Sequence, residues 1–357
     1  RCPPLRMNLI HNFTEGFKNY DKMRGIIYIL AMLVVLGCND ESGVKVLRGQ
    51  AFGTTYQIQY YGHPLAQTVA VGVDSVVRRV NASISTYQDN SLISAINRGE
   101  THIKVDSTFL AVFNLSREVY NNTDRYFDPT VGILRNAYGF GQNRALEVLS
   151  GAVLDSLCLR VGLDKVSLDS SGGITKMYPE IYLDFNAIGK GYGIDLIGLH
   201  LESLGVTDYL VELGGEIRVK GTNRTKQKSW TIGIEAPSQN ENERIIARTL
   251  ELDNQSMASS GNYRKFRVDS LTGFRFVHTI DPLTCSAEQS NVTSATVLAA
   301  TCAEADAYAT AFMAMGLERS IKVLETQKHL AAYLTYIDQD QHTRWYATMG
   351  LEERLGY

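Results

Sequence analysis

The sequence predicts an α+β fold in which helices cover a largely antiparallel sheet. Through the first half of the chain, apolar residues recur every three or four positions, which indicates amphipathic helices. The second half holds short alternating segments rich in β-branched and aromatic residues. A doubly wound fold would instead alternate strands and helices throughout. There is no internal repeat and no low-complexity linker, so residues 46–357 are expected to form one domain of two closely packed lobes.

The composition is that of an ordinary globular protein. The 357 residues are 44% hydrophobic and 20% charged, which argues against a fibrous or a disordered chain. The net charge is -3, and no run of lysine and arginine is interleaved with aromatic residues. Nucleic acid is therefore not an expected partner.

The N-terminal segment has the features of an export signal. Residues 1–22 do not begin with Met and are expected to be an upstream extension outside the fold. In residues 23–37 a basic start precedes the apolar run 26–36, which is too short to span a bilayer. The ending L-G-C resembles a bacterial lipobox, so Cys38 is the predicted lipidation site and residues 38–45 the tether. We expect a lipid anchor in the bacterial cell envelope, facing the periplasm; the alternative is a short buried helix.

The first half of the chain predicts one interrupted strand followed mainly by helices. The strand spans 46–62 and breaks at Gly53. The expected helices are 65–84, 92–97, 106–121, a helix that opens at 126–130 and runs to Tyr138, and 146–161. Pro129 lies just inside one helix start, and Gly139 ends that helix.

The second half predicts mainly strands, around the two helices 189–204 and 300–316. The expected strands are 165–168, 173–177, 181–185, 209–213, 216–221, 230–234, 244–252, 264–268, 274–280, 292–298, 331–337 and 345–349. Residues 256–263, S-M-A-S-S-G-N-Y, are small and polar and are predicted to form a loop between strands.

The helix at 300–316 carries two oxygen side chains on one face. Thr301 and Glu304 have the spacing of a capping box, and Gly316 is the expected stop. Asp306 lies too far inside to cap the helix, and Thr310 follows one turn later on the same side. A carboxylate and a hydroxyl suit a hard cation such as Mg²⁺. The alternative is that Asp306 caps a neighbouring loop while Thr310 bonds to its own helix.

A second candidate site is the run D-F-N-A-I-G-K-G-Y-G at 184–193, which closes a predicted strand and opens a helix. Backbone N–H groups at a helix start suit a phosphate, and Lys190 adds a positive charge beside them. A helix start eased by glycine is the alternative. Elsewhere, His278 lies near the end of a predicted strand, where it is a candidate for chemistry or for a structural role.

Three cysteines remain in the predicted domain, Cys158, Cys285 and Cys302. They do not make a disulfide framework, so each is expected to be a small buried hydrophobic residue. A bridge between Cys285 and Cys302 stays possible.

Eight segments in order resemble one family. They are A-F-G-T-T-Y, S-T-Y, F-D-P-T-V-G, D-F-N-A-I-G-K-G-Y, V-E-L-G-G-E-I, S-S-G-N-Y, H-T-I-D-P and E-A-D-A-Y-A-T. In this order they resemble the ApbE family of FAD:protein FMN transferases, which are often exported lipoproteins. The resemblance spans about residues 47–316.

The resemblance implies a reaction and a set of site residues. FAD is cleaved at its pyrophosphate, FMN is joined to a threonine or serine of an acceptor flavoprotein, and AMP leaves. Mg²⁺ would be held by Asp306, Thr310 and the carbonyl of Ala187, with His278 as the base. The residues expected to line the FAD site are Phe52, Tyr87, Tyr126, Phe127, Asp128, Asp184, Lys190 and Ile280. An FAD pyrophosphatase, a non-catalytic flavin-binding lipoprotein and a solute-binding lipoprotein are the alternatives.

Three positions depart from the family pattern. Phe52 replaces a methionine, a change between two large apolar residues. Cys285 stands where glycine is usual, and a cysteine would be strained there if the position requires a positive φ. Ala309 stands where some members carry a second aspartate, which predicts weaker Mg²⁺ binding.

Overall fold

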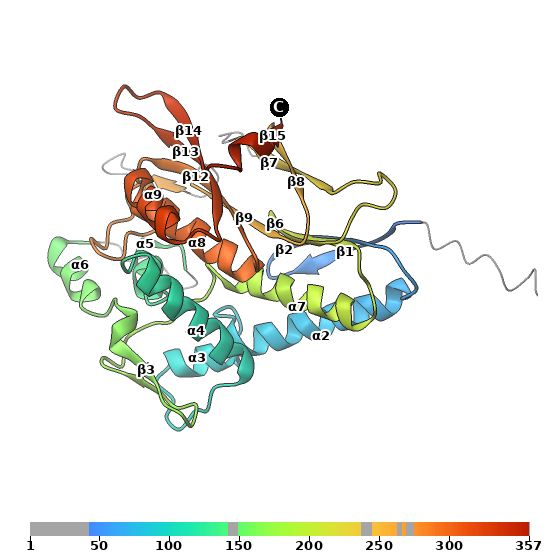
Figure 1. Ribbon diagram of the computed structural model, residues 1–357. Helices are drawn as coiled ribbons and strands as arrows, with labels where there is room; N and C mark the ends of the chain where they lie inside the picture. Colours follow the sequence, from blue (N-terminus) through green and yellow to red (C-terminus); the bar gives the residue numbers. More distant parts are fainter. Residues whose placement is uncertain (1–42, 142–148, 237–244, 263–265, 269–274, 357) are drawn as a thin grey trace, which may run out of the picture. The chain divides into compact units, whose positions relative to one another are not determined.

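The computed structural model describes residues 43–141, 149–236, 245–262, 266–268 and 275–356. Val44–Tyr357 form one compact unit, which contains the described helices and strands (Figure 1). Cys38 and the predicted signal lie outside the described residues, so their assignment stays a prediction, as does the division into two lobes. Of the helices that the structure describes, none combines the length and the apolar character needed to cross a bilayer.

An eight-stranded sheet lies at the centre of this unit. Its order is β1-β2-β5-β6-β9-β12-β13-β14, and each neighbouring pair is antiparallel. The strands are β1 (Lys45–Ala51), β2 (Thr54–Tyr60), β5 (Tyr209–Leu213), β6 (Glu216–Lys220), β9 (Ser256–Gly261), β12 (Val292–Ala299), β13 (Ala331–Ile337) and β14 (Thr343–Ala347). The predicted α+β fold with a largely antiparallel sheet is confirmed.

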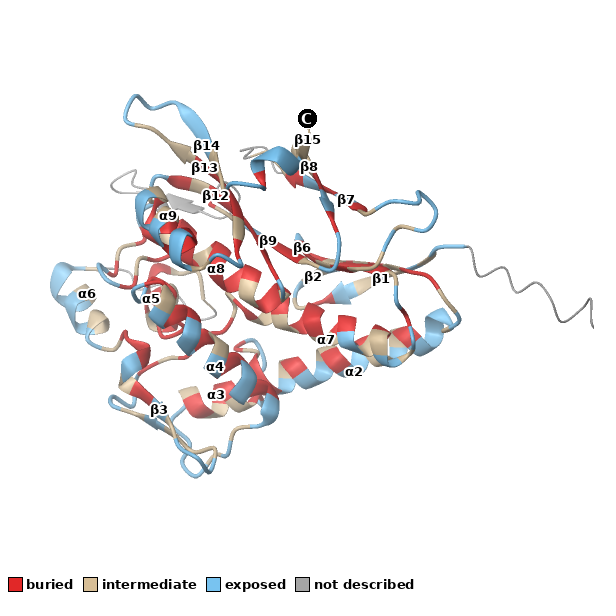
Figure 2. Cartoon of the chain, in the orientation of Figure 1, coloured by how far each residue is buried: buried red, intermediate tan, exposed pale blue. Residues whose placement is uncertain are grey.

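Helices cover one face of this sheet (Figure 1). The described helices are α2 (Ala66–Ile84), α3 (Leu92–Asn97), α4 (Ser107–Asn122), α5 (Gly132–Tyr138), α6 (Gly151–Cys158), α7 (Gly189–Ser203), α8 (Cys302–Met315) and α9 (Leu317–Thr326), with short 3-10 turns at Leu163–Lys165 and Glu352–Arg354. Of these, α2, α7, α8 and α9 pack on strands of the main sheet. Helix α7 packs on β5 and β6, and α8 packs on β9 and β12. Figure 2 shows α8 buried along most of its length, whereas α2 exposes one side to solvent.

A smaller sheet covers the opposite face. It consists of β7 (Trp230–Glu235), β8 (Ile246–Leu252) and β15 (Leu355–Gly356), in the order β15-β8-β7. Ile217 and Val219 of β6 pack with Trp230 and Leu250 in the core between the two sheets. Because successive side chains of a strand point to opposite faces, Glu216 and Arg218 of β6 face the helices instead.

Two short hairpins complete the fold. They are β3 (Val166–Leu168) with β4 (Ile174–Lys176), and β10 (Phe266–Val268) with β11 (Arg275–Val277). β11 leads directly into the loop that carries His278 and Ile280.

Short sequence motifs predicted the bounds of many elements correctly. Helix α8 starts one residue after Thr301, whose hydroxyl accepts a hydrogen bond from the Glu304 amide at 3.3 Å. Helices α3 and α7 and strand β5 match their predicted ranges to within one residue. Gly316 has a φ of 78° and a ψ of 171°, so it ends α8 in an extended conformation with positive φ and not in the left-handed helical one.

Two predicted elements are wrong, and two others have shorter bounds than predicted. Residues 256–263 were expected to form a loop, but Ser256–Gly261 form β9, whose small side chains fit beneath α8. Residues 181–185 form no strand; Tyr182 makes only an isolated bridge with Val131. The helix expected from 126–130 starts at Gly132 instead, because the Asp128 carboxylate binds the Thr130 amide in a turn. The predicted strand 274–280 ends at Val277.

The helix predicted at 146–161 is shorter than expected. Ser150 accepts a hydrogen bond from the Val153 amide at 3.4 Å, and α6 therefore starts at Gly151. Residues 146–148 lie outside the described residues.

The cysteine prediction is also corrected. Cys158 at the end of α6 and Cys285 form a disulfide, although 127 residues separate them in the sequence. Cys302 is free and buried, so the considered bridge from Cys285 to Cys302 does not form. The sequence could not reveal this pair, because the chain between the two cysteines folds through much of the main sheet before it returns.

Candidate active site

Helix α8 presents its two predicted metal ligands near the start of α7. Asp306 is only 4% exposed, and its Oδ2 accepts a hydrogen bond from the Gly191 amide of α7 at 3.1 Å. Thr310 is half-buried one turn further along α8. Asp306 therefore does cap another segment, as the alternative proposed, but that segment is the predicted phosphate-binding helix start.

Glycine at position 191 allows this close approach. A side-chain carbon there would lie 2.3 Å from the Cys302 carbonyl oxygen and 2.8 Å from the Ala303 Cα, both of them backbone atoms of α8. The two helix backbones can therefore meet only because residue 191 has no side chain.

Lys190, Glu216 and Asp306 form a buried charged cluster beside this contact. The Lys190 ammonium pairs with the Glu216 carboxylate, and Glu216 is 3% exposed. Burial alone would lower the pKa of Lys190, but Glu216 and Asp306 outweigh it and hold that pKa above its ordinary value. Burial raises the pKa of Asp306 to about 7, against the opposing effect of Lys190.

The residues at this cluster fit a hard divalent cation. Two buried carboxylates lie near the Lys190 ammonium, which pairs with Glu216, and Glu216 Oε2 is buried without a hydrogen-bond partner. Ala187 lies in the turn that leads into α7, four residues before Gly191, and its carbonyl is the third predicted ligand beside the Asp306 and Thr310 oxygens. Carboxylate, hydroxyl and carbonyl oxygens are the ligands that Mg²⁺ prefers.

A second polar group surrounds Asp184, which precedes the same turn. Asp184 accepts a hydrogen bond from the Asn186 amide at 2.8 Å and pairs with the Arg135 guanidinium of α5. Burial alone would lower the pKa of Arg135, but Asp184 and Tyr87 hold it above its ordinary value. Tyr87 is 60% exposed, so its ring is open to a ligand.

Arg135, like Glu216, was not predicted from the sequence. Arg135 lies in a short, mostly apolar helix between the Tyr126–Asp128 stretch and Gly139, and a lone cation in such a helix was the available signal. Its partner Asp184 is 49 residues away in the sequence, so the pairing itself was not visible.

The Tyr126–Asp128 stretch is buried. Asp128 accepts hydrogen bonds from the Thr130 amide at 2.8 Å and the Thr130 hydroxyl at 2.6 Å, so it shapes the turn before α5. Burial raises the pKa of Asp128 to about 6. Phe127 is 3% exposed and belongs to the main core. Tyr126 lies beneath the Arg319 guanidinium of α9, 5.3 Å from the ring centre.

Phe52 lies at the tip of the β1–β2 hairpin, where it has a φ of 50°. Its ring packs on α7, because a side-chain carbon at Gly193 would lie 2.4 Å from the Phe52 ring. The hairpin thus holds an aromatic ring within one turn of Lys190 and Gly191.

The loop after β11 carries the predicted base. His278 is half-buried, and the neighbouring Thr279 hydroxyl donates a hydrogen bond to Asn262 Oδ1 at 3.0 Å. Ile280 is buried with Leu134 and Tyr138 of α5. These contacts place the His278 loop against α5. The role of His278 as a base stays a prediction.

Cys285 closes this loop with a positive φ of 59°. The Tyr138 hydroxyl donates a hydrogen bond to its carbonyl at 3.0 Å, and the disulfide to Cys158 ties its side chain to α6. The position therefore does require the conformation that glycine adopts most easily, and two tertiary contacts hold the cysteine there.

Comparisons with known proteins identify the family of this chain. The sequence profile of the ApbE family matches residues 52–334. The FAD:protein FMN transferase of Haemophilus influenzae is 34% identical over 323 residues, which cover 87% of this chain and 91% of that protein. The enzyme of the same name from Vibrio cholerae is 34% identical over 313 residues, covering 86% and 92%.

Solved structures of two relatives share the fold. The flavin transferase ApbE from Vibrio cholerae has a TM-score of 0.77 and 31% identity over 87% of this chain and 99% of its own. The flavinyl transferase ApbE from Pseudomonas stutzeri, in its apo form, also has a TM-score of 0.77, with 26% identity over 88% and 98%. On the profile, the sequence identity and the shared fold, this chain belongs to the ApbE family.

Proposed function

We propose that this chain is an FAD:protein FMN transferase that moves FMN from FAD to a threonine or serine of an acceptor flavoprotein and releases AMP. The observation that carries the proposal is the contact between Asp306 of α8 and the Gly191 amide of α7, with Lys190 beside it. It joins an acidic metal-binding helix to a helix start suited to a pyrophosphate, in a chain 34% identical to enzymes of this name.

The reaction replaces one phosphorus–oxygen bond by another. The acceptor hydroxyl oxygen attacks the phosphorus on the FMN side of the pyrophosphate, and a new phosphoester bond forms. The bond from this phosphorus to the bridging oxygen breaks, and AMP leaves with the electron pair. The hydroxyl proton passes to His278, since a threonine hydroxyl is a poor nucleophile while it keeps its proton.

The start of α7 would bind the pyrophosphate. The positive end of the helix and the Lys190 ammonium attract the phosphate oxygens, and burial strengthens both interactions. When bound by Asp306, Thr310 and the Ala187 carbonyl, Mg²⁺ would neutralise charge on the pyrophosphate as it develops. Asp306 contributes one carboxylate, and Ala309 leaves the site without a second one on α8.

The flavin end would lie between Phe52 and Tyr87. Phe52 offers a ring face at the hairpin tip, and Tyr87 is exposed beside the Arg135–Asp184 pair. The ion pair with Arg135 holds the Asp184 carboxylate in place, so that Asp184 can accept hydrogen bonds from a ligand. Tyr126, Phe127 and Asp128 are buried, and their proposed role is to support this region from the core.

The experiment that tests the function separates transfer from hydrolysis. The purified protein is incubated with FAD, Mg²⁺ and a flavoprotein acceptor bearing a threonine, and the acceptor is examined by in-gel flavin fluorescence and intact mass. We expect a fluorescent acceptor whose mass increases by one FMN phosphoester, with AMP released in equal amount. Free FMN and AMP with an unlabelled acceptor would make the protein an FAD pyrophosphatase. FAD binding without any cleavage would make it a flavin-binding protein.

A further inference from the structure

Helix α7 and strand β6 face each other through charged side chains. On β6, the side chains at every second position point toward the helix layer, and on α7 three charged residues point back. The residues on β6 are Glu216, Arg218 and Lys220, and those on α7 are Lys190, Asp195 and Glu202.

These residues form ion pairs in the same order along both elements. Lys190 pairs with Glu216, then Arg218 Nη1 donates to Asp195 Oδ1 at 2.7 Å. Further along, Lys220 Nζ donates to Glu202 Oε2 at 2.6 Å. In the first pair the positive charge lies on α7, whereas in the second and third pairs it lies on β6. A shift of α7 along β6 would therefore bring like charges together, and the pairs fix the position of the helix on the strand.

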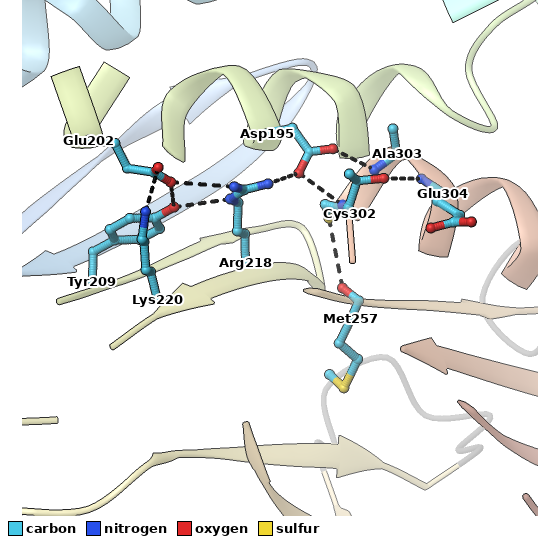
Figure 3. A network of polar contacts seen from close by, with 10 residues as sticks. Asp195, Glu202, Tyr209, Arg218, Lys220, Met257, Cys302, Ala303 and Glu304 are labelled. Atoms are coloured by element: carbon cyan, nitrogen blue, oxygen red, sulfur yellow. Dashed lines mark hydrogen bonds and ion pairs between the residues drawn. The ribbon is translucent and has the colours of Figure 1, made fainter. Parts of the chain in front are cut away.

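Asp195 differs from the other members of this network because it also reaches α8. Its Oδ1 accepts a hydrogen bond from the Cys302 amide, and its Oδ2 accepts one from the Ala303 amide, both at 2.9 Å. Figure 3 shows the Asp195 carboxylate between the Arg218 guanidinium on one side and the first turn of α8 on the other. Asp195 is 7% exposed, so solvent cannot readily replace these contacts.

The first turn of α8 depends on this carboxylate. The first amides of a helix have no partner within the helix, and here Cys302 and Ala303 donate to Asp195 while Glu304 donates to Thr301. A carboxylate also interacts favourably with the positive end of the helix. The start of the metal-binding helix is thus held by a residue of α7.

The second contact between α7 and α8 lies one turn away on each helix. Gly191 precedes Asp195 by four residues, and Asp306 follows Cys302 by four. Gly191 binds Asp306 at 3.1 Å, while Asp195 binds Cys302 at 2.9 Å. Two contacts spaced in this way fix both the rotation and the translation of α8 relative to the start of α7.

From this geometry we infer that Asp195 is a positioning residue for the metal site, which sets the place of Asp306 relative to Lys190 and Ala187. The inference rests on the proposed function, since it concerns the Mg²⁺ ligands named there. Asp195 is not one of the proposed ligands of the metal; it acts through the backbone of α8. Residues that orient metal ligands in this way change metal affinity by about 10- to 100-fold when they are replaced.

The main test is Asp195→Asn, measured by calorimetric titration of the purified protein with Mg²⁺. An asparagine has one acceptor oxygen in place of two. Its NH₂ group, which only donates, would face another donor, either a backbone amide of α8 or Arg218, and at least one hydrogen bond would be lost. We expect Mg²⁺ affinity to fall by about 10- to 100-fold. FAD affinity measured without Mg²⁺ should stay the same, and circular dichroism should show an intact fold.

Glu202→Gln is the matched control. Glu202 binds the same arginine, with Arg218 Nη2 at 3.4 Å from its Oε1, and it lies on the same helix but makes no described contact with α8. We expect this variant to lose thermal stability while it binds Mg²⁺ as the wild type does. Asp306→Asn gives the baseline, that is, the Mg²⁺ binding that remains without the proposed site, including weak binding to surface carboxylates such as Asp338 and Asp340.

A second variant breaks the same contact from the α8 side, in case Asp195→Asn fails to fold. Cys302 is the first residue of α8, where proline is tolerated, and Thr301 has the φ of -120° and ψ of 150° that suit a residue before proline. Cys302→Pro removes one of the two amides that donate to Asp195, the one that binds Oδ1, whereas Cys302→Ala keeps both. We expect weaker Mg²⁺ binding only in the proline variant.

The outcomes distinguish this inference from the proposed function. Weaker Mg²⁺ binding in Asp195→Asn and Cys302→Pro, with Glu202→Gln and Cys302→Ala unchanged, supports it. Wild-type Mg²⁺ affinity in Asp195→Asn or in Cys302→Pro would overturn it and leave Asp195 a stabilising residue only. If the wild type binds Mg²⁺ no better than Asp306→Asn, the proposed metal site itself is wrong.

Discussion

At the scale of single residues, burial determines how several predicted ligands behave. Asp128, Asp184 and Asp306 are all aspartates of family motifs, yet their surroundings differ. All three are buried, but Asp184 pairs with the Arg135 guanidinium, whereas Asp128 and Asp306 have raised pKa values. Sequence motifs therefore identified the residues but not which of them are paired.

Asp128 gives a prediction for stability against pH. Burial raises its pKa to about 6 in the folded protein from 3.8, so the folded state holds the proton more tightly than the unfolded state. The stability that protonated Asp128 contributes is therefore fully present below pH ~4 and is lost as the pH rises through ~6. The free energy of unfolding falls by roughly 3 kcal/mol over this range. Asp128→Asn cannot ionise and should escape this loss.

The measurement for Asp128 is the free energy of unfolding by urea between pH ~4 and ~7. The wild type should lose stability relative to Asp128→Asn across this range. A difference between the two proteins that does not change with pH would show that Asp128 does not titrate there.

His278 gives a kinetic prediction at the same scale. As a base, it should contribute to turnover more than to binding, so His278→Ala should lower kcat by roughly 100-fold or more. The KM for FAD should change much less, as measured in the acceptor-labelling assay. Equal losses in FAD affinity and turnover would instead identify His278 as a binding residue.

At the scale of elements, prediction succeeded where the signal was local. The start of α8 follows from Thr301 and Glu304, and the end of α5 follows from Gly139, because caps involve residues a few positions apart. β9 was missed because its small polar residues resemble a loop, and only its pairing with β6 and β12 makes it a strand. The strand predicted at 181–185 is absent for the opposite reason, because the segment has a strand-like pattern but pairs with no neighbouring strand.

The same limit applies to the site. The sequence placed Lys190, Asp306 and Thr310 on the right helices, because each lies in a motif with a recognisable helix start. It could not supply Glu216 or Arg135, whose partners lie 26 and 49 residues away. Such pairs depend on the packing of the sheet and helices, which no short segment specifies.

The Cys158–Cys285 disulfide gives a prediction for the His278 loop. It closes a segment of 127 residues and fastens the end of this loop to α6. Its loss should lower the free energy of unfolding by roughly 2–5 kcal/mol. Dithiothreitol should therefore destabilise the wild type in urea unfolding but leave Cys158→Ser unchanged. Equal sensitivity of both proteins to the reductant would contradict the assignment.

At the scale of the whole molecule, a three-layer arrangement brings the site together. The helix layer carries α7 and α8, the main sheet supplies Glu216 from β6, and the small sheet buries the opposite face of that strand. The reactive groups come from segments far apart in the sequence, so the site depends on the complete unit Val44–Tyr357.

The N-terminal residues give a prediction for location. The lipobox-like ending at Cys38 predicts that the mature protein starts at this cysteine and carries lipid there. Expressed in a bacterium, the wild type should be found in the membrane fraction with a lipid mass on its N-terminal peptide, and Cys38→Ala should lose both. An unmodified Cys38 in the membrane fraction would rule out lipid anchoring.

The central claim is that Asp306 holds a metal used in flavin transfer, and Asp306→Asn tests it most directly. Asparagine keeps the shape and an acceptor for the Gly191 amide but lacks the charge. Because burial raises the pKa of Asp306 to about 7, its ionised form destabilises the folded state as the pH rises through that value, so the variant should fold normally. The measurement is Mg²⁺-dependent FMN labelling of the acceptor by wild type and variant. We predict a loss of roughly 100-fold or more in a fully folded protein; undiminished labelling by Asp306→Asn would contradict the account.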